Sequence, residues 1–427
     1  MTIPVSLWRR AELQLRPGLV TACLALWLIP AFAAAQESDW RGAISQMRFV
    51  QSFSTAEINA YSTKLYSRVT PPQAHYAVDL YLLTFTSTDE DDNPIDIVAQ
   101  LYIPRLDYLG EVPVYMMGSG TTGIVGKCAP SRELPEVRNW GNYRAHMLSY
   151  ASQGYIGILP DYQGFNDAEG LHYYFVADLE GRVMLDAARA VYAVFENSPL
   201  LVAPSDDVFL AGYSQGGHAI FAATDLAPDY APEINVRGVI GYGATTNVAA
   251  LMRDIPYFTP YILYAYAQYY GPDTADVARV LNPRWIPTFE QDVTGRCIDE
   301  MSTYYGQDPR QVYQAEFYDA LVSGRLAEQF PNLQAALDMN STGVVRGEVP
   351  SLILHGGADP IVTTPSQDAF VRQQCSLGAS VTYRVYPGVH HFQVRQVGFR
   401  DALAWMQSIV DGEAPPSDCV RLLSQSR

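Results

Sequence analysis

A glycine-flanked serine is the feature of this sequence that most directly suggests chemistry. The motif Gly212-Tyr213-Ser214-Gln215-Gly216 directly follows an apolar run at 208–211 and precedes a small-residue segment at 218–223 that is typical of a helix. A serine on a sharp strand-to-helix turn needs neighbours without bulky side chains, because the turn is strained and packs closely. The motif alone is a weak signal, but its place between a predicted strand and a predicted helix makes Ser214 a candidate nucleophile.

A serine hydroxyl is a poor nucleophile, so a histidine base and an acid that orients this base should accompany Ser214. In enzymes with this type of turn, the acid and the histidine follow the serine in that order. Asp359 comes shortly after one apolar run, and the neighbouring His390 and His391 come shortly after the next. Each would therefore lie just past the C-terminal end of a strand, where parallel sheets collect their active groups.

Other residues fit these roles less well. Asp161 and Asp186 precede the serine, which breaks the expected order, so we interpret them as residues that cap or pair within the fold. His218 and His355 neighbour the predicted catalytic turns, and we interpret both as structural or supporting residues. The sequence contains no SxxK and no HExxH motif, which argues against a nucleophile of the β-lactamase type and against a zinc protease.

The reaction also needs hydrogen-bond donors for the negative charge that develops on the substrate oxygen. One predicted donor is the backbone N–H of Gln215, beside the nucleophile at the start of a helix. The other should come from the glycine-rich loop Gly118–Gly123, which follows an apolar run at 112–117. Within this loop we select Thr121, with Thr122 as the alternative.

The same loop also matches a nucleotide-binding pattern. Gly118, Gly120 and Gly123 satisfy GxGxxG after a strand, as in dinucleotide sites. No acidic residue, however, follows at the end of a clear second strand about 20 residues later. The next Gly-Lys pair resembles part of a phosphate loop, but Cys128 stands where Ser or Thr is required. Nucleotide binding is therefore the weaker alternative, and we predict no organic cofactor and no metal.

Apolar runs and helical stretches predict the scaffold that positions these residues. Two partly alternating runs at 76–87 and 95–103, around an acidic turn, predict an opening β-hairpin. Short apolar runs then alternate with predicted helices, which indicates a mostly parallel sheet covered on both faces. The runs lie at 112–117, 155–159, 208–211, 236–242, 351–354 and 381–386, and the helices at 176–197, 215–226, 364–376 and 396–410.

About a hundred residues between Ala244 and Gly347 contain no clear strand and are rich in tyrosine. A structureless loop of this length is implausible inside a compact domain. We predict a helical cap, or lid, at 247–347, inserted between two segments of the core at 36–246 and 348–427. We expect most of its tyrosines to pack within the cap rather than to line a substrate pocket.

The N-terminus predicts export. Three arginines precede an apolar run at 18–33, and small residues follow, which predicts a signal peptide at 1–35 rather than a membrane anchor. The protein would then be secreted or periplasmic, where an even set of cysteines favours two disulfides in one of three pairings. The cysteines that remain after cleavage are Cys128, Cys297, Cys375 and Cys419.

Composition restricts the size of the core and the partners. The chain has 427 residues, of which 48% are hydrophobic and 17% charged, so it can bury a large core as one domain with an insertion or as two domains. Its formal charge is −17, which argues against nucleic acid as a partner, because binding phosphates needs a basic surface. The wide spacing of the cysteines argues against a structural zinc site.

Taken together, these motifs resemble the secretory lipase family, α/β-hydrolases that include fungal lipase A enzymes and bacterial exported esterases. The resemblance rests on Gly212–Gly217, on Cys128–Ser131, on Pro160–Gly164, and on the acid and histidine segments. It covers roughly residues 75–415, and the Cys-Ala-Pro-Ser segment is its most specific part. One departure is Ser119, which stands where many hydrolases have histidine in the oxyanion loop.

The resemblance implies an α/β-hydrolase fold with a cap over the active site, and lipid or other small acyl-ester substrates. It implies disulfides between Cys128 and Cys297 and between Cys375 and Cys419. Related hydrolases have histidine three residues after the glycine of its turn, which selects His391 over His390 as the base. The predicted activity is ester hydrolysis through an acyl-enzyme; a serine peptidase and a non-catalytic binding protein on the same fold are the alternatives.

Overall fold

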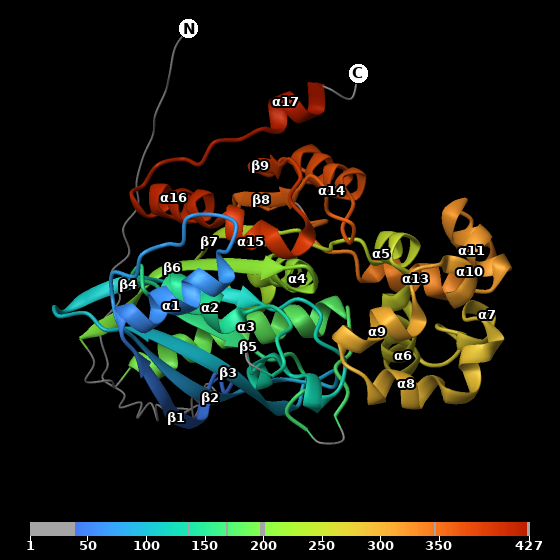
Figure 1. Cartoon of the computed structure of the whole chain (residues 1–427), viewed down its shortest axis with the longest axis horizontal. Coiled ribbons are helices and arrows are strands. Elements are labelled where there is room, and N and C mark those ends of the chain that lie inside the picture. The colour runs from blue at the N-terminus through green and yellow to red at the C-terminus, as the bar shows by residue number, and fades with distance from the viewer. Residues whose placement is uncertain (1–38, 135–136, 168–169, 197–200, 346, 425–427) are drawn as a thin grey trace, which may run out of the picture. The chain divides into compact units, whose positions relative to one another are not determined.

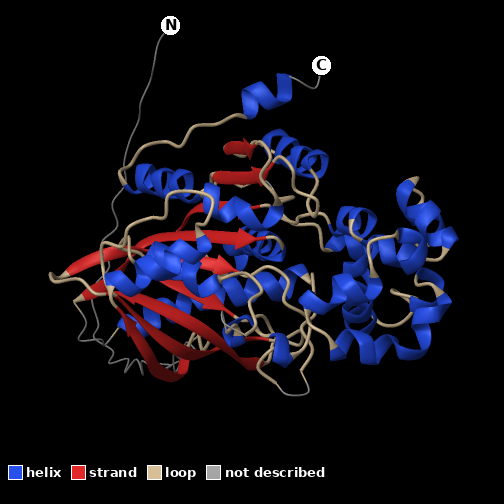
Figure 2. Ribbon diagram, in the orientation of Figure 1, coloured by secondary structure: helices blue, strands red, loops and turns tan. Residues whose placement is uncertain are grey.

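A nine-stranded sheet runs through the described part of this computed structural model, which comprises residues 39–134, 137–167, 170–196, 201–345 and 347–424. Its strand order is β1-β2-β3-β5-β4-β6-β7-β8-β9 (Figures 1 and 2). The strands are β1 (Ile44–Phe53), β2 (Val78–Thr88), β3 (Pro94–Pro104), β4 (Gly110–Gly118), β5 (Ile156–Pro160), β6 (Val202–Tyr213), β7 (Val236–Tyr242), β8 (Ser351–Gly356) and β9 (Val381–Tyr386). The predicted signal peptide at 1–35 lies outside the described residues.

Most neighbouring strands run parallel, as predicted. The pairs from β5 and β4 through to β8 and β9 are all parallel, whereas β1 with β2, β2 with β3, and β3 with β5 are antiparallel. The predicted opening hairpin is confirmed as β2 and β3, whose register runs from Val78 opposite Pro104 to Thr88 opposite Pro94. The edge strand β1 was not predicted, because eight of its ten positions are exposed and it carries no alternating apolar pattern.

Helices cover the sheet in two layers. In one layer, Phe399 of α16 packs against Tyr66, which follows α1, and against Tyr150 of α2. In the other layer, α3 contacts α4, and Phe221 of α4 packs against Phe370 of α14. The helices outside the segment between β7 and β8 are α1 (Thr55–Leu65), α2 (Tyr143–Ala151), α3 (Ala177–Phe195), α4 (Gln215–Tyr230), α14 (Thr364–Ser376), α15 (Val394–Val397), α16 (Phe399–Val410) and α17 (Cys419–Ser424).

Between β7 and β8 the described chain is helical and adds no strand to the sheet; we call this segment the helical insertion. Its helices gather on the side toward which the arrowhead of β6 points, yellow to orange in Figure 1. They are α5 (Val248–Asp254), α6 (Thr259–Tyr270), α7 (Val277–Val280), α8 (Phe289–Gly295), α9 (Ile298–Tyr305), α10 (Pro309–Val312), α11 (Ala315–Val322), α12 (Leu326–Gln329) and α13 (Pro331–Met339).

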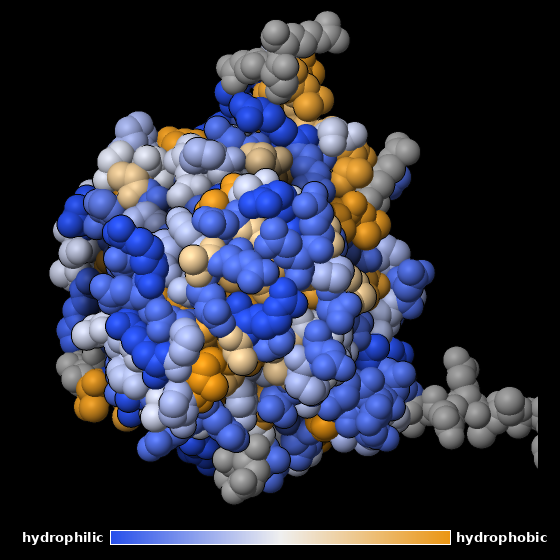
Figure 3. Space-filling view, turned by 90° about the vertical axis from the view of Figure 1, so that its right-hand side faces the viewer, coloured by the Kyte–Doolittle hydropathy of each residue, from blue (hydrophilic) through white to orange (hydrophobic). Residues whose placement is uncertain are grey.

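The helical insertion has a hydrophobic core of its own. Tyr261 and Tyr266 of α6 are fully buried in it, and their hydroxyls donate to the carbonyl oxygens of Arg296 and Phe175. Most of the tyrosine-rich run is therefore occupied with packing. On the outer face of the insertion, hydrophilic residues predominate and apolar residues form separate patches (Figure 3). Within the described residues, no helix combines the length and the apolar character that a membrane span requires.

Candidate active site

Ser214 occupies a strained turn between β6 and α4. Its backbone angles are φ 55° and ψ −116°, in a region that non-glycine residues rarely adopt. The two glycines of the motif are required for space, because a Cβ atom on Gly212 would lie 2.0 Å from the carbonyl oxygen of Gly216, and one on Gly216 would lie 2.0 Å from that of Gly118. The turn thus places Ser214 between the end of β6 and the first residue of α4.

Asp359 and His391 meet beyond the ends of β8 and β9. His391 Nδ1 donates a hydrogen bond to Asp359 Oδ2 over 2.7 Å, and both side chains are buried. The other carboxylate oxygen, Asp359 Oδ1, accepts from the backbone N–H groups of Ile361 and Val362 at 2.8 and 3.0 Å. These contacts hold the carboxylate in place and assign the Nδ1 proton, so Nε2 is left free to accept a proton.

Ser214 and His391 line the same cavity, which has a volume of about 260 Å³. Among the described residues, no hydrogen bond joins the serine hydroxyl to the imidazole, and in apo structures such catalytic contacts are often long until substrate binds. His390, the alternative base, is exposed and does not line the cavity. His391, and not its neighbour, therefore contacts Asp359 and shares a cavity with Ser214.

Thr121 lines the same cavity from the loop after β4. Its hydroxyl shares a hydrogen bond of 2.6 Å with the hydroxyl of the buried Tyr174, and burial raises the pKa of Tyr174 well above its usual value, so this phenol stays protonated. The neighbouring N–H of Gly120 is already used, because it donates to Tyr143 Oη at 2.7 Å. Thr122 is buried, and its carbonyl oxygen accepts from Ile298 N at 2.9 Å.

The remaining wall of the cavity comes from residues that the sequence analysis did not single out. Trp140, the adjacent Tyr257 and Phe258, Ile298, and Phe392 next to His391 come from four separate parts of the chain, and no single motif connects these parts. Trp140 Nε1 also donates to Asp299 Oδ1 at 3.2 Å, which links the core to the helical insertion at the cavity. Among the six tyrosines between positions 257 and 270, Tyr257 alone lines this cavity.

The two alternative acids have partners elsewhere. Asp161 accepts from the backbone N–H of Ser131 at 2.8 Å and from its hydroxyl, and burial raises the pKa of Asp161 to about 7. Asp186 accepts from Ser87 Oγ and pairs with Arg189 at 2.7 Å. Neither lines the cavity at Ser214.

The two further histidines also lie outside the cavity wall. His355 Nε2 contacts Thr364 Oγ1 at 3.2 Å, and burial lowers the pKa of His355. His218 is fully buried in α4 and pairs with Glu180 at 2.6 Å. Among the described residues, no group of three or more histidine, cysteine, aspartate and glutamate side chains has the arrangement of a metal site.

Two disulfides connect distant parts of the chain. Cys128 pairs with Cys297, and Cys375 pairs with Cys419. This is the pairing that the resemblance implies. The first bond joins the segment after the oxyanion loop to the residue before α9, and so ties the core to the helical insertion beside the cavity.

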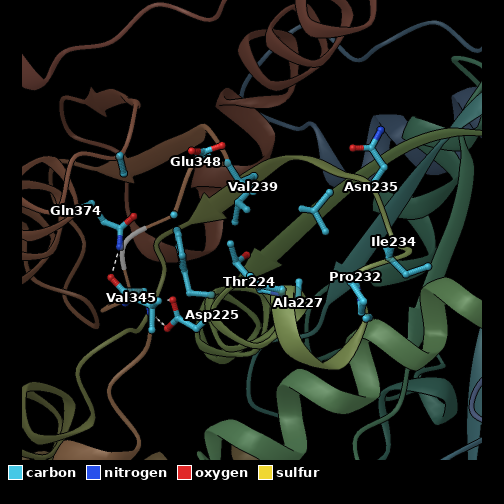
Figure 4. A pocket seen from close by; sticks show the side chains of 18 of the residues that line it. Thr224, Asp225, Ala227, Pro232, Ile234, Asn235, Val239, Val345, Glu348 and Gln374 are labelled. Atoms are coloured by element: carbon cyan, nitrogen blue, oxygen red, sulfur yellow. Dashed lines mark hydrogen bonds between the residues drawn. The ribbon is translucent and has the colours of Figure 1, made fainter. Parts of the chain in front are cut away.

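A larger cavity of about 480 Å³ lies elsewhere, between α4, the start of β7 and the segment at 343–349 (Figure 4). Its described lining contains no serine, cysteine or histidine. The carboxylate of Asp225 accepts from the backbone N–H groups of Gly343, Val344 and Val345 at 2.7, 3.3 and 3.4 Å. This cavity lacks a nucleophile with a base, so the smaller one is the candidate active site.

Comparison with known proteins decides the family. The sequence profile of the secretory lipases matches residues 144–418, which include the serine turn, the acid and the histidine. The chain belongs to the secretory lipase family. Among the relatives of this secretory lipase is lipase A of Moesziomyces aphidis, which is 29% identical over 358 residues, covering 79% of this chain and 74% of the relative.

Solved structures show the fold. The closed state of Candida antarctica lipase A has a TM-score of 0.64 at 22% identity, covering 88% of this chain and 83% of that chain. A ligand-bound form of LipA, a rice cell wall degrading esterase from Xanthomonas oryzae, has a TM-score of 0.69 at 19% identity, covering 91% and 100%. The secretory lipase described here therefore has the α/β-hydrolase fold, as the resemblance implied. Its family and its two disulfides agree with a secreted protein.

Proposed function

We propose that this protein hydrolyses carboxylic esters with Ser214 as the nucleophile, His391 as the general base and Asp359 as the residue that orients the base. The observation that carries this proposal is the cavity that Ser214 and His391 share, with His391 held by Asp359 at 2.7 Å. The family and the names of its relatives, lipases and an esterase, support an ester as the substrate.

The reaction follows from the hydrogen bonds of these three residues. His391 Nδ1 already donates to Asp359, so Nε2 takes the proton as the Ser214 hydroxyl attacks the ester carbonyl carbon. The tetrahedral intermediate collapses as the protonated imidazole gives this proton to the leaving alcohol. Water then attacks the acyl-enzyme with His391 again as the base, and the carboxylic acid is released.

Two backbone N–H groups stabilise the oxyanion in this proposal, those of Gln215 and Thr121. Gln215 is the first residue of α4, where N–H groups without partners in the helix favour negative charge. Thr121 lines the cavity, and the hydrogen bond from its hydroxyl to Tyr174 holds the residue in place. Such donors are typically worth about 3 kcal/mol of transition-state stabilisation each.

The remaining assignments also belong to the proposal. The helical insertion acts as a cap, since Tyr257, Phe258 and Ile298 line the cavity from it. The substrates are lipids or other acyl esters that enter this apolar wall, and the cap touches the lipid surface when they are presented in aggregates. Residues 1–35 form a signal peptide that is removed on export.

The test is the substitution Ser214→Ala. Its control is Ser149→Ala, which removes the hydroxyl of a different buried serine, located in α2. Ser214→Ala should lower the kcat for a p-nitrophenyl ester at least about 1,000-fold and abolish labelling by a fluorophosphonate probe. Ser149→Ala should keep both. Turnover by Ser214→Ala at the wild-type rate would refute the proposal, and faster cleavage of peptide amides than of esters would indicate a peptidase.

A further inference from the structure

Four buried polar side chains meet behind the serine turn, and the reaction described above uses none of them directly. They are Glu180 of α3, Gln215 and His218 of α4, and His172 from the loop before α3, each no more than 1% exposed. We call them the Glu180 cluster. Burying four such groups is costly unless every donor meets an acceptor. Their hydrogen bonds therefore restrict which of them carry a proton.

His218 meets an acceptor at both ring nitrogens. Nδ1 lies 2.6 Å from Glu180 Oε2, and Nε2 lies 2.8 Å from the main-chain oxygen of Asn340. A carbonyl oxygen cannot donate, and a neutral imidazole has a single N–H, so a neutral ring would leave one contact without a proton unless the carboxyl carried it. Both contacts are satisfied by an imidazolium that donates from Nδ1 to an ionised Glu180 and from Nε2 to the main-chain oxygen of Asn340.

His172 is the opposite case. Burial lowers the pKa of His172 to about 4, and its ring also contacts the main-chain oxygen of Gln163. Its Nε2 lies 2.6 Å from Gln215 Nε2, an amide nitrogen that can only donate. A neutral ring that donates to Gln163 and accepts from Gln215 satisfies both contacts. The cluster thus holds one charged and one neutral histidine around a single carboxylate.

Glu180 connects this charge arrangement to the proposed oxyanion donor. Its Oε1 accepts from Gln215 Nε2 at 2.7 Å and from the backbone N–H of Phe175 at 3.1 Å. The side chain of Gln215 is therefore held at two points, by Glu180 and by His172. This fixes the residue whose backbone N–H directly follows Ser214, and so limits rotation of the peptide that would face the substrate oxygen.

The opposite charges of Glu180 and His218 also affect the electrostatics at the proposed oxyanion site. A lone carboxylate behind the start of α4 would oppose negative charge on the substrate oxygen, because charges interact strongly in a buried site. The His218 imidazolium cancels the charge of Glu180 at 2.6 Å. Around His218, the other charged or titratable groups are His172 and Asp225, and the ring of Phe175 packs edge-on at 4.9 Å.

From these contacts we infer that Glu180 and His218 form a buried ion pair that positions Gln215 for oxyanion stabilisation. The inference rests on the proposed function, since it assigns Gln215 N–H to the oxyanion. Both are positioning residues, because neither lines the cavity. The pair also joins α4 to the end of the helical insertion, since Asn340 directly follows α13.

The experiment compares Glu180→Gln, His218→Gln and the double variant with Asp186→Asn. Asp186 is a matched control: it is a buried carboxylate on the same helix, with Ser87, Tyr230 and Arg189 as partners and no contact with the cluster. Each single cluster variant should lower kcat on a soluble p-nitrophenyl ester on the order of tenfold, with KM nearly unchanged. The double variant should be no slower than the slower single variant, because the two residues act as a unit.

A second measurement uses the wild-type protein, so it does not depend on whether the variants fold. Nitrogen-15 NMR of the imidazoles should show both nitrogens of His218 protonated near neutral pH, and His172 neutral. A singly protonated His218, an unchanged kcat in Glu180→Gln, or an equal loss in Asp186→Asn would each overturn the inference. The proposed function has a separate test, because it is wrong if Ser214→Ala keeps its activity. If Ser214→Ala is inactive and Glu180→Gln is fully active, only the inference about the ion pair is wrong.

Discussion

Replacing Gly243 with alanine should disturb the histidine and its acid without touching either side chain. Gly243 follows β7 and adopts φ +52°, in the left-handed region that disfavours residues with a Cβ. A Cβ atom built there would lie 3.0 Å from His391 Nδ1 and 3.2 Å from Asp359 Oδ2. Both distances are shorter than ordinary van der Waals contacts, so the imidazole and the carboxylate must shift by a few tenths of an ångström.

Two effects of different size follow. The left-handed backbone should lower the free energy of unfolding by about 1–2 kcal/mol. A misplacement of 1 Å in a catalytic group can cost about 100-fold in rate, so a shift of a few tenths should lower kcat/KM by roughly three- to tenfold. The activity loss would arise from the position of His391 and not from unfolding, since the fold should retain most of its stability.

Gly324→Ala separates the two effects. Gly324 has φ +70°, and a Cβ atom there meets nothing within 4 Å. It should therefore cost similar stability with no loss of ester hydrolysis. Thermal unfolding and p-nitrophenyl ester kinetics on both variants test this. Wild-type kcat/KM in Gly243→Ala, or equal activity losses in the two variants, would refute the reasoning.

Four further predictions follow from the site and its supports. Asp359→Asn should reduce kcat by several thousand-fold while the protein stays folded, because an amide favours the wrong imidazole tautomer; near-normal kcat would argue against the acid assignment. Tyr174→Phe removes the partner of the Thr121 hydroxyl and should lower kcat severalfold, and kcat equal to wild type would argue against Thr121 as a donor. Replacing Cys128 and Cys297 with serine should lower the free energy of unfolding by about 1 kcal/mol more than replacing Cys375 and Cys419, because the first disulfide closes a loop of 169 residues and the second a loop of 44. Equal losses in a denaturant titration would contradict this. Burial raises the pKa of Asp161 to about 7, so the cost of ionising this buried carboxyl destabilises the native state progressively between pH 4 and 7. Asp161→Asn should therefore gain stability relative to wild type over that range, by at most about 4 kcal/mol. A stability difference that does not change with pH would contradict this.

Much of the site could be predicted because the strands and their ends are encoded locally. Short apolar runs identify the parallel strands, and the carboxyl ends of parallel strands meet at one edge of a sheet. Ser214, Asp359 and His391 each follow such a run, so their approximate meeting follows from the chain itself. The strain at Ser214 is also visible in the sequence, since the motif places glycines where the turn has no room for a side chain.

Other features depend on contacts between segments far apart in the chain. The sequence prefers His391 over His390 only by likeness to related hydrolases, whereas the contact of His391 with Asp359 depends on how the segments after β8 and β9 pack. The edge strand β1 carries no apolar alternation, and its pairing with β2 is what makes it a strand.

The sequence by itself therefore determined the type of fold, the strand ends and the residues available for chemistry, because these depend on periodicity and on local turns. Tertiary structure alone decided the wall of the cavity and the partner of each buried group. Glu180 and His218 are 38 positions apart, and their contact exists only because α3 packs against α4. The protonation of a buried side chain depends on the groups that packing places around it, and no local pattern encodes them.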